Sequence, residues 1–362
     1  MDYDSRQKKL RSAVAKQRLD ALLVTHLPNI QYLCGFTGSA AALLITAHET
    51  IFFTDGRYTE QARAEVQGAK VVIARKTPLV AAGEWLAGKA KKLRLRTAGI
   101  EAQHVNVAER SGLSKTLSSS VRLRECPPLV EQARMVKDPE EIEKLRKAVL
   151  LGSSLFEIAL RAIRPGIKEV EVAADMEYKA RRAGAEAMSF ETIIASGPRS
   201  ALPHGRASEA IIPANGFVVC DFGVILASYC SDMTRTVHVG KLSSEARRIY
   251  QAVRDAQQAA VAAVRPGVPV SKVDEAARKL LNKQGLAKYF THSTGHGVGL
   301  EIHEPPRIAA KQNEELKPGM VITVEPGVYI PDLGGVRIED MVVVNQDGCE
   351  VLTPTSKELV VI

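Results

Sequence analysis

The stretch VVCDFGVILASYCSDMTRT, residues 218–236, decides the fold, because it predicts a β-hairpin that carries two acids. Asp221 lies in a run of apolar and β-branched residues, and Asp232 opens a second such run. Burying a carboxylate without a partner costs several kcal/mol. Because residues 218–234 contain no Lys or Arg, the sequence predicts a metal cation as the partner of both acids.

An internal repeat surrounds this hairpin. Arg164-Pro165-Gly166-Ile167 recurs as Arg265-Pro266-Gly267-Val268, and a predicted helix that ends at a glycine follows each copy. Each half of the repeat then supplies two acids, which are Asp221 with Asp232 and Glu325 with Glu339. The repeat therefore predicts a pseudo-twofold domain in which four carboxylates meet at the centre.

A histidine-rich segment, HSTGHGVGLEIHE at residues 292–304, lies between the two acidic pairs. Its three glycines allow the backbone to approach a site closely, which favours a functional role for the histidines. His296 is the best candidate for a metal ligand. Four carboxylates with one imidazole suit Mn(II), Co(II), Fe(II) or Zn(II) in a two-metal arrangement better than a tetrahedral structural zinc.

The chain has 362 residues, which exceeds the usual limit of roughly 250 to 300 for one core and predicts two domains. Residues 1–127 alternate short strands with amphipathic helices, as in an α/β domain. The predicted helices are 6–18, 59–66 and 79–93, and the predicted strands are 21–24, 41–45, 70–74, 98–100 and 121–124. Cys126-Pro127-Pro128 makes a linker, and residues 128–362 form the second domain, which opens with a helix from Asp138 toward Ile163.

Composition excludes several classes of protein. Five cysteines without a CxxC pair, and an N-terminus without an apolar core, favour reduced thiols in the cytoplasm. No apolar run has transmembrane length, so we expect no membrane partner. The net charge of +8 would suit nucleic acid, but aromatic residues make up only 5% of the chain, which argues against nucleic-acid binding.

With these motifs in hand, the chain resembles the proline-specific metallopeptidases, Xaa-Pro aminopeptidase (aminopeptidase P) and Xaa-Pro dipeptidase (prolidase), of the pita-bread superfamily. The resemblance covers nearly the whole chain, including GFTG at 35–38 and FTDGRY at 53–58. It implies a creatinase-like (ribonuclease-H-like) α/β N-terminal domain and an α+β pita-bread C-terminal domain. The family's five metal ligands are matched in the motifs DFG, SDMTRT, TGHGVGLEIHE, EPGVYIP and GGVRIED by Asp221, Asp232, His296, Glu325 and Glu339.

The resemblance also implies a role for each ligand. Asp221 would chelate one metal, His296 would complete the shell of the other, and Asp232 and Glu339 would bridge the pair. Glu325 would bind metal and transfer protons. Two divalent ions per subunit are implied, with Mn(II) favoured over Co(II), Zn(II) or Fe(II).

Further residues match the family's substrate site. His303 resembles the imidazole that steadies the substrate carbonyl oxygen, and His204 resembles the second imidazole that lines the pocket. His292 resembles a histidine that closes the substrate site. Arg307 matches an arginine that holds the carboxylate of a dipeptide in some prolidases. Thr234 and Arg337 would hold the bridging carboxylates from outside the metal site.

The sequence thus predicts a cytoplasmic two-metal exopeptidase that releases the residue before proline from Xaa-Pro peptides, as a homodimer or higher oligomer. A prolidase that acts only on dipeptides is the close alternative. A catalytically silent pita-bread module that binds peptides is the more distant one.

Overall fold

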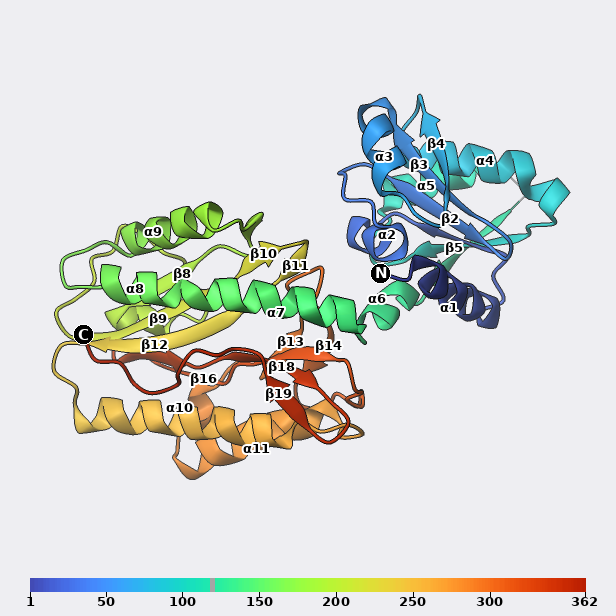
Figure 1. Ribbon diagram of the computed structural model, residues 1–362. Coiled ribbons are helices and arrows are strands. Elements are labelled where there is room, and N and C mark those ends of the chain that lie inside the picture. The colour runs from blue at the N-terminus through green and yellow to red at the C-terminus, as the bar shows by residue number, and fades with distance from the viewer. Residues whose placement is uncertain (118–120) are drawn as a thin grey trace. The chain divides into compact units, whose positions relative to one another are not determined.

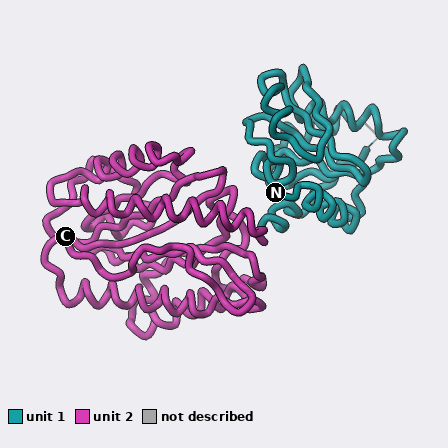
Figure 2. The backbone as a smooth tube through the Cα atoms, viewed as in Figure 1, with its two compact units in different colours: residues 1–134 teal, residues 135–362 magenta. Residues whose placement is uncertain are grey.

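The computed structural model describes residues 1–117 and 121–362, which divide into two compact units, Met1–Arg134 and Met135–Ile362 (Figure 2). The sequence analysis placed the domain boundary after residue 127. In the structure the short helix α6 (Leu129–Arg134) follows that point and belongs to the N-terminal unit.

The N-terminal unit is built on one six-stranded sheet in the order β4-β3-β2-β1-β5-β6. Strand β2 runs antiparallel to both of its neighbours, and the other strands run parallel. The strands are β1 (Ala21–Val24), β2 (Ala42–Thr46), β3 (Thr50–Asp55), β4 (Lys70–Ala74), β5 (Thr97–Glu101) and β6 (Arg122–Cys126). The helices are α1 (Tyr3–Lys16), α2 (Leu27–Cys34), the 3₁₀ turn η1 (Gly56–Tyr58), α3 (Thr59–Glu65), α4 (Pro78–Leu93), α5 (Val107–Leu117) and α6.

The C-terminal unit places its helices on both sides of the strands (Figure 1). Its helices are α7 (Pro139–Ser154), α8 (Phe156–Ala162), α9 (Glu169–Arg182), α10 (Ser244–Ala263) and α11 (Val270–Lys283), with the 3₁₀ turns η2 (Gly197–Ala201) and η3 (Ala287–Tyr289). Its first strands are β7 (Ala187–Met188), β8 (Ile193–Ser196), β9 (Gly216–Phe222), β10 (Val224–Leu226), β11 (Tyr229–Cys230) and β12 (Met233–Val239). The later strands are β13 (Gly295–Gly297), β14 (Glu304–Ile308), β15 (Val321–Val324), β16 (Gly327–Ile330), β17 (Gly334–Arg337), β18 (Asp340–Val344) and β19 (Cys349–Val351). Within the described ranges, no helix has the length and apolar character needed to span a bilayer.

The predicted acidic hairpin is confirmed. Strands β9 and β12 pair in antiparallel fashion, with Asp221 opposite Thr234. A second small hairpin, β10 with β11, is inserted between them and pairs with β7 instead. Asp232 lies between this insertion and β12, so both acids reach the same end of the β9–β12 ladder.

The internal repeat is visible in the backbone. Gly166 and Gly267 adopt positive φ angles of 88° and 78°, which glycine tolerates best, and they donate their N–H groups to the carbonyls of Ile212 and Leu316. The helix pair α8–α9 covers one side of the strands and α10–α11 the other (Figure 1). This arrangement matches the pseudo-twofold fold that the sequence predicted.

The two half-sheets, β12-β9-β8 and β14-β13-β15-β18-β19, meet along β12 and residues 337–339. Glu339 donates its backbone N–H to the Thr234 carbonyl at 3.1 Å. Thr236 Oγ1 donates to the Arg337 carbonyl at 2.9 Å and accepts from the Arg337 N–H at 3.1 Å. This seam brings the acids of the two halves together.

Helix α7 begins as predicted and ends earlier. Asp138 accepts from the Glu141 N–H, and the Glu141 side chain accepts from the Asp138 N–H, so the predicted capping box forms. The single helix expected toward Ile163 is instead two, α7 and α8, with the break at Leu155. The break follows Gly152-Ser153-Ser154, a run of weak helix formers.

Asp138→Ala should lower the free energy of unfolding of the C-terminal unit by about 1 kcal/mol, because it removes the N-cap of α7. Urea unfolding followed by circular dichroism measures this change. Asp175→Ala, at an exposed position of α9, is the matched control and should change stability by less than about 0.5 kcal/mol. An equal response of the two variants would contradict the capping role.

Candidate metal centre

Four of the five predicted ligands form one close cluster in the C-terminal unit. Ligand atoms of Asp232, His296 and Glu339 lie within 4.8 Å of one another. His296 Nε2 lies 3.6 Å from Asp232 Oδ2 and 3.6 Å from Glu325 Oε1. His296 lies in β13, Glu325 directly follows β15, and Asp232 and Glu339 directly precede β12 and β18, so the cluster draws on both halves of the repeat.

Asp221 joins the cluster through a different partner. Its Oδ2 accepts a hydrogen bond from Arg337 Nη2, and both side chains are largely buried. The sequence analysis found no basic residue within 218–234, and Arg337 reaches the site from the other half of the repeat. One of the four acidic charges that the sequence brings here is therefore offset by an arginine.

Three carboxylate oxygens of the site have no hydrogen-bond partner within the part of the chain that the structure describes. Among the described residues, Asp221 Oδ1, Asp232 Oδ1 and Glu339 Oε1 are buried and accept no hydrogen bond. Buried oxygens of this kind are costly unless a cation coordinates them. Three carboxylate oxygens without hydrogen bonds and one histidine nitrogen are suitable ligands for divalent cations, because such cations accept both carboxylate and imidazole donors.

The raised pKa values of three acids in the cluster also indicate a site for cations. Burial, together with the charges of Asp221 and Glu325, raises the pKa of Asp232 well above its usual value. Burial and the Asp232 charge do the same to the pKa of Glu339, and burial raises the pKa of Glu325 to about 8. The protein fold therefore resists ionising these acids unless positive charge enters the site.

His296 is held in the form that binds metal. Its Nδ1 donates to the Gly297 carbonyl at 3.0 Å, which leaves the Nε2 lone pair facing the carboxylates. Burial lowers the pKa of His296 to about 4, so the ring stays neutral near pH 7. A Cβ on Gly295 would lie 2.0 Å from the Thr323 carbonyl oxygen, so only glycine lets β13 approach β15 this closely.

The other predicted site residues lie around this cluster. The rings of His303 and His296 pack edge to face with centroids 4.4 Å apart, and partial desolvation lowers the pKa of His303. His204 is exposed and close enough to His292 and His303 to lower the pKa of both. Arg307 lies directly opposite His296 in the β13–β14 pair, so both side chains project from the same face.

Thr234 and Arg337 contact the ligands as predicted. Thr234 Oγ1 donates to Glu339 Oε2 at 2.6 Å and accepts from Arg337 Nε at 3.2 Å. Arg337 Nη1 also donates to the carbonyl of Pro203 at 3.1 Å, which anchors the loop that carries His204.

The sequence analysis missed Tyr329, which connects His292 to this network. Arg337 Nη1 donates to Tyr329 Oη at 2.6 Å, and Tyr329 Oη lies 2.9 Å from His292 Nε2. Because His292 Nδ1 donates to the Ser293 carbonyl at 2.7 Å, Nε2 is the acceptor of the tyrosine hydroxyl. Tyr329 lies in an apolar strand, where an aromatic residue usually indicates core packing, so only the fold reveals this contact.

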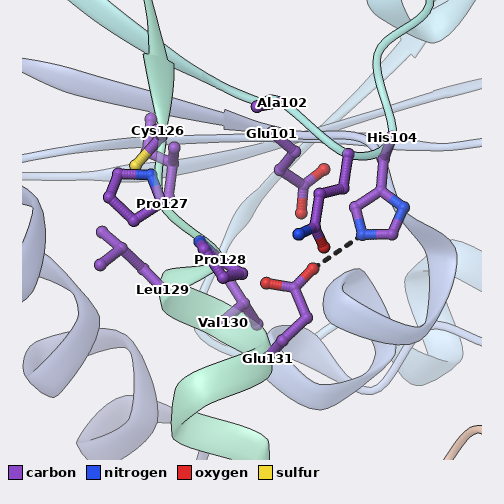
Figure 3. Close-up of a pocket in the computed structure, with 11 residues that line it drawn as sticks. Glu101, Ala102, His104, Cys126, Pro127, Pro128, Leu129, Val130 and Glu131 are labelled. Atoms are coloured by element: carbon purple, nitrogen blue, oxygen red, sulfur yellow. Dashed lines mark hydrogen bonds and ion pairs between the residues drawn. The ribbon is translucent and has the colours of Figure 1, made fainter. Parts of the chain in front are cut away.

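A second polar cluster, in the N-terminal unit, does not have metal-site geometry (Figure 3). His104 Nε2 lies 2.8 Å from Glu131 Oε1, and Asn29 Nδ2 donates to both Glu101 and Glu131 at 2.7 Å. The adjoining cavity of about 10 Å³ has room for roughly one water molecule. In the described residues, only the Asp232, His296 and Glu339 group brings three potential ligand atoms within coordinating distance.

Comparison with known proteins identifies the class of this chain. Residues 143–346 match metallopeptidase family M24, and residues 6–136 match the creatinase/prolidase N-terminal domain. The chain therefore belongs to metallopeptidase family M24 and is a hydrolase with the pita-bread fold in its C-terminal unit. The buried group of Asp232, His296 and Glu339 could hold a metal ion, which is consistent with membership of a metallopeptidase family.

Individual relatives carry two kinds of name. The Xaa-Pro dipeptidase of Pyrococcus furiosus is 46% identical over 245 residues, covering 68% of this chain and 70% of the relative. The structure of an Xaa-Pro dipeptidase from Bacillus anthracis is 38% identical, with a TM-score of 0.95 over 99% of this chain and 100% of the other. The structure of an X-Pro aminopeptidase from Thermotoga maritima is 35% identical, with a TM-score of 0.88 over 99% and 100% of the two chains.

The metal-free protein should become less stable as the pH rises from about 7 to about 8, a range in which the histidines whose pKa burial lowers are largely neutral in both the folded and the unfolded state. Because the folded state raises the pKa of Asp232, Glu325 and Glu339, it holds more protons than the unfolded chain in this range, and stability falls with pH. Thermal unfolding of chelated protein across this pH range measures the slope. Excess Mn(II) should flatten the slope, and a melting temperature of chelated protein that rises with pH would contradict the electrostatic account.

Proposed function

We propose that this chain is a two-metal exopeptidase that hydrolyses the peptide bond before proline, with Xaa-Pro dipeptides as its preferred substrates. The observation that carries the proposal is the buried cluster of Asp232, His296 and Glu339, with orphaned carboxylate oxygens beside it. All five residues that the sequence matched to metal ligands are then assigned that role: Asp221, Asp232, His296, Glu325 and Glu339.

The contacts that the five residues already make indicate which ion each of them would bind. Asp221 would bind one ion while Arg337 holds its other oxygen, and His296 would bind the second ion through Nε2. Asp232 and Glu339 would contact both ions. Two divalent ions, with Mn(II) preferred, would activate water and polarise the scissile carbonyl.

Glu325 is proposed to move the proton. Burial raises the pKa of Glu325 to about 8 in the absence of cations, and neighbouring divalent charge would lower that pKa. A carboxylate poised near the working pH can take a proton from the attacking water and give it to the leaving nitrogen. The delivery is needed because the amide nitrogen must gain a proton before the C–N bond breaks, so that proline leaves as a secondary amine.

His303 and His204 are proposed to stabilise the negative charge that develops on the carbonyl oxygen. Both are exposed beside the cluster, where a bound peptide can reach them. His292 is proposed to close the substrate site, supported by its hydrogen bond with Tyr329.

Arg307 supports the preference for dipeptides. Its exposed guanidinium lies on the face of β14 that neighbours His296, where it can pair with the free carboxylate of an Xaa-Pro dipeptide. The sequence alone favoured release of Xaa from longer peptides. The names of the dipeptidase relatives shift the preference toward dipeptides, and the similarity to the Thermotoga maritima aminopeptidase keeps the longer substrate as the second candidate. The homodimer stays a prediction.

Mn(II)-loaded protein should release Xaa from Xaa-Pro with a higher kcat/KM than from Xaa-Pro-Yaa. The comparison uses one Xaa residue in both peptides and follows free amino acid by chromatography. Arg307→Met should reduce kcat/KM for the dipeptide by about 10-fold or more through loss of a charge-assisted contact, and should leave the tripeptide rate nearly unchanged. A preference for the tripeptide would make the chain an aminopeptidase, and no release from either would favour the silent peptide-binding module.

Asp232→Asn should abolish both Mn(II)-induced thermal stabilisation and at least about 99% of hydrolysis, because metal catalysis supplies several kcal/mol to the reaction. In chelated protein at pH 8 the same variant should unfold at a higher temperature than the parent, since it removes a buried charge without a partner. Asp255→Asn, an exposed acid on α10, is the matched control and should behave as the parent. Undiminished turnover in Asp232→Asn would contradict the assignment.

A further inference from the structure

Lys137 and Glu304 form a buried ion pair outside the metal cluster. Lys137 Nζ lies 3.1 Å from Glu304 Oε2, and the two side chains are only 1% and 2% exposed. A buried ion pair gains little net stability over apolar residues of the same size, because both charges must be desolvated. Fold stability alone is therefore a weak reason for a charged pair at this position.

Glu304 closes the loop that carries His303. The loop, residues 298–303, connects β13 and its His296 to β14, and Glu304 is the first residue of β14. Glu304 Oε1 accepts the Glu301 N–H at 3.1 Å. A Cβ on Gly299 would lie 2.6 Å from the same oxygen, so the loop backbone folds tightly around this carboxylate.

The backbone at Lys137 is also held in place by hydrogen bonds. Lys137 donates its backbone N–H to the Gly319 carbonyl at 2.9 Å, and Val136 forms an antiparallel bridge with Met320. Met320 directly precedes β15, which ends just before Glu325. The backbone that carries the Lys137 ammonium group is therefore hydrogen-bonded next to β15, the strand that leads to Glu325.

The loop also contacts the segment before Asp232. Cys230 donates its backbone N–H to the Gly299 carbonyl at 2.8 Å, two residues before Asp232. The buried pair thus lies where the loop with His303, the β15 segment and the approach to Asp232 come together. Without the ammonium group, the buried Glu304 carboxylate would lose its ion pair with Lys137, and the loop would lose the contact that anchors Glu304.

We infer that Lys137 is a positioning residue: through Glu304 it holds loop 298–303 so that His303 faces the reacting carbonyl. The effect on turnover rests on the function proposed above, whereas the effect on loop order does not. Lys137 follows the last residue of the N-terminal unit, Arg134, by three positions, so a residue at the start of the C-terminal unit acts on its active site.

Three variants test this inference in the full-length, Mn(II)-loaded protein. Lys137→Met leaves the carboxylate without its cation, Glu304→Gln removes the charge but keeps an acceptor for Glu301, and the double variant removes both charges. Lys147→Met, which removes a lysine that is 64% exposed on α7, is the matched control. The measurements are hydrogen exchange of residues 298–303 by mass spectrometry, bound metal, melting temperature, kcat and KM.

Lys137→Met should raise exchange in residues 298–303 by about 10-fold or more, with bound metal unchanged. It should lower kcat by about 10- to 100-fold, with KM within about threefold of the parent, because a small displacement of a catalytic group is costly. The double variant should regain melting temperature without regaining kcat or protection of the loop. Glu304→Gln provides a second test if Lys137→Met does not fold.

Unchanged exchange in residues 298–303 would overturn the inference, as would recovery of kcat together with melting temperature in the double variant. Failure of the parent protein to cleave any Xaa-Pro peptide would instead overturn the proposed function. In that case the exchange measurement still decides whether Lys137 positions the loop.

Discussion

The C-terminal unit depends on one electrostatic constraint, which is that several carboxylates are desolvated at the same point. Asp232 is 5% exposed and Glu339 is 1% exposed, and burial together with neighbouring carboxylate charges raises the pKa of both. Water cannot screen these charges, and Arg337 forms an ion pair with Asp221 while lowering the pKa of Asp232 and Glu325 only in part. Protonation or divalent cations can neutralise the remaining acids, so we expect metal binding to stabilise the fold at neutral and higher pH.

The strand geometry decides which acids stay available for cations. Glu339 and Asp340 are adjacent in sequence, yet strand alternation turns them to opposite faces. Asp340 is neutralised by Arg235 Nη2 at 2.7 Å and by Lys357 Nζ at 2.7 Å. Glu339 receives only the hydroxyl of Thr234 on one oxygen, while its other oxygen is left for a cation. Strand alternation thus places Asp340 beside two basic residues and leaves one oxygen of the adjacent Glu339 without a partner.

The two halves of the repeat are incomplete without each other. Each half ends in a short sheet that carries two acids, and the seam between Thr234, Thr236 and residues 337–339 joins the sheets. His296 comes from the second half and contacts an acid from each. A site built on a seam of paired strands is rigid, which suits a reaction that requires water, substrate and proton carrier in fixed positions.

Local sequence determined much of this protein. Strands 21–24 and 70–74 agree with β1 and β4 at both ends, and the capping box at Asp138 forms as expected, because these signals depend only on near neighbours. Helices α2 and α5 were not predicted, since α2 is short and largely apolar and α5 has little amphipathic pattern. The spacing of acids and glycines was enough to identify the residues that come together as candidate ligands.

Only the tertiary structure decided how those ligands are compensated and held. The contacts Arg337 with Asp221, Tyr329 with His292, and Lys137 with Glu304 join segments that lie far apart in the chain or read as ordinary core residues. No periodicity encodes them, because a charge finds its partner through the packing of whole strands rather than through its neighbours in sequence. The sequence thus specified which groups could bind metal, and the fold decided which of their oxygens remain free to do so.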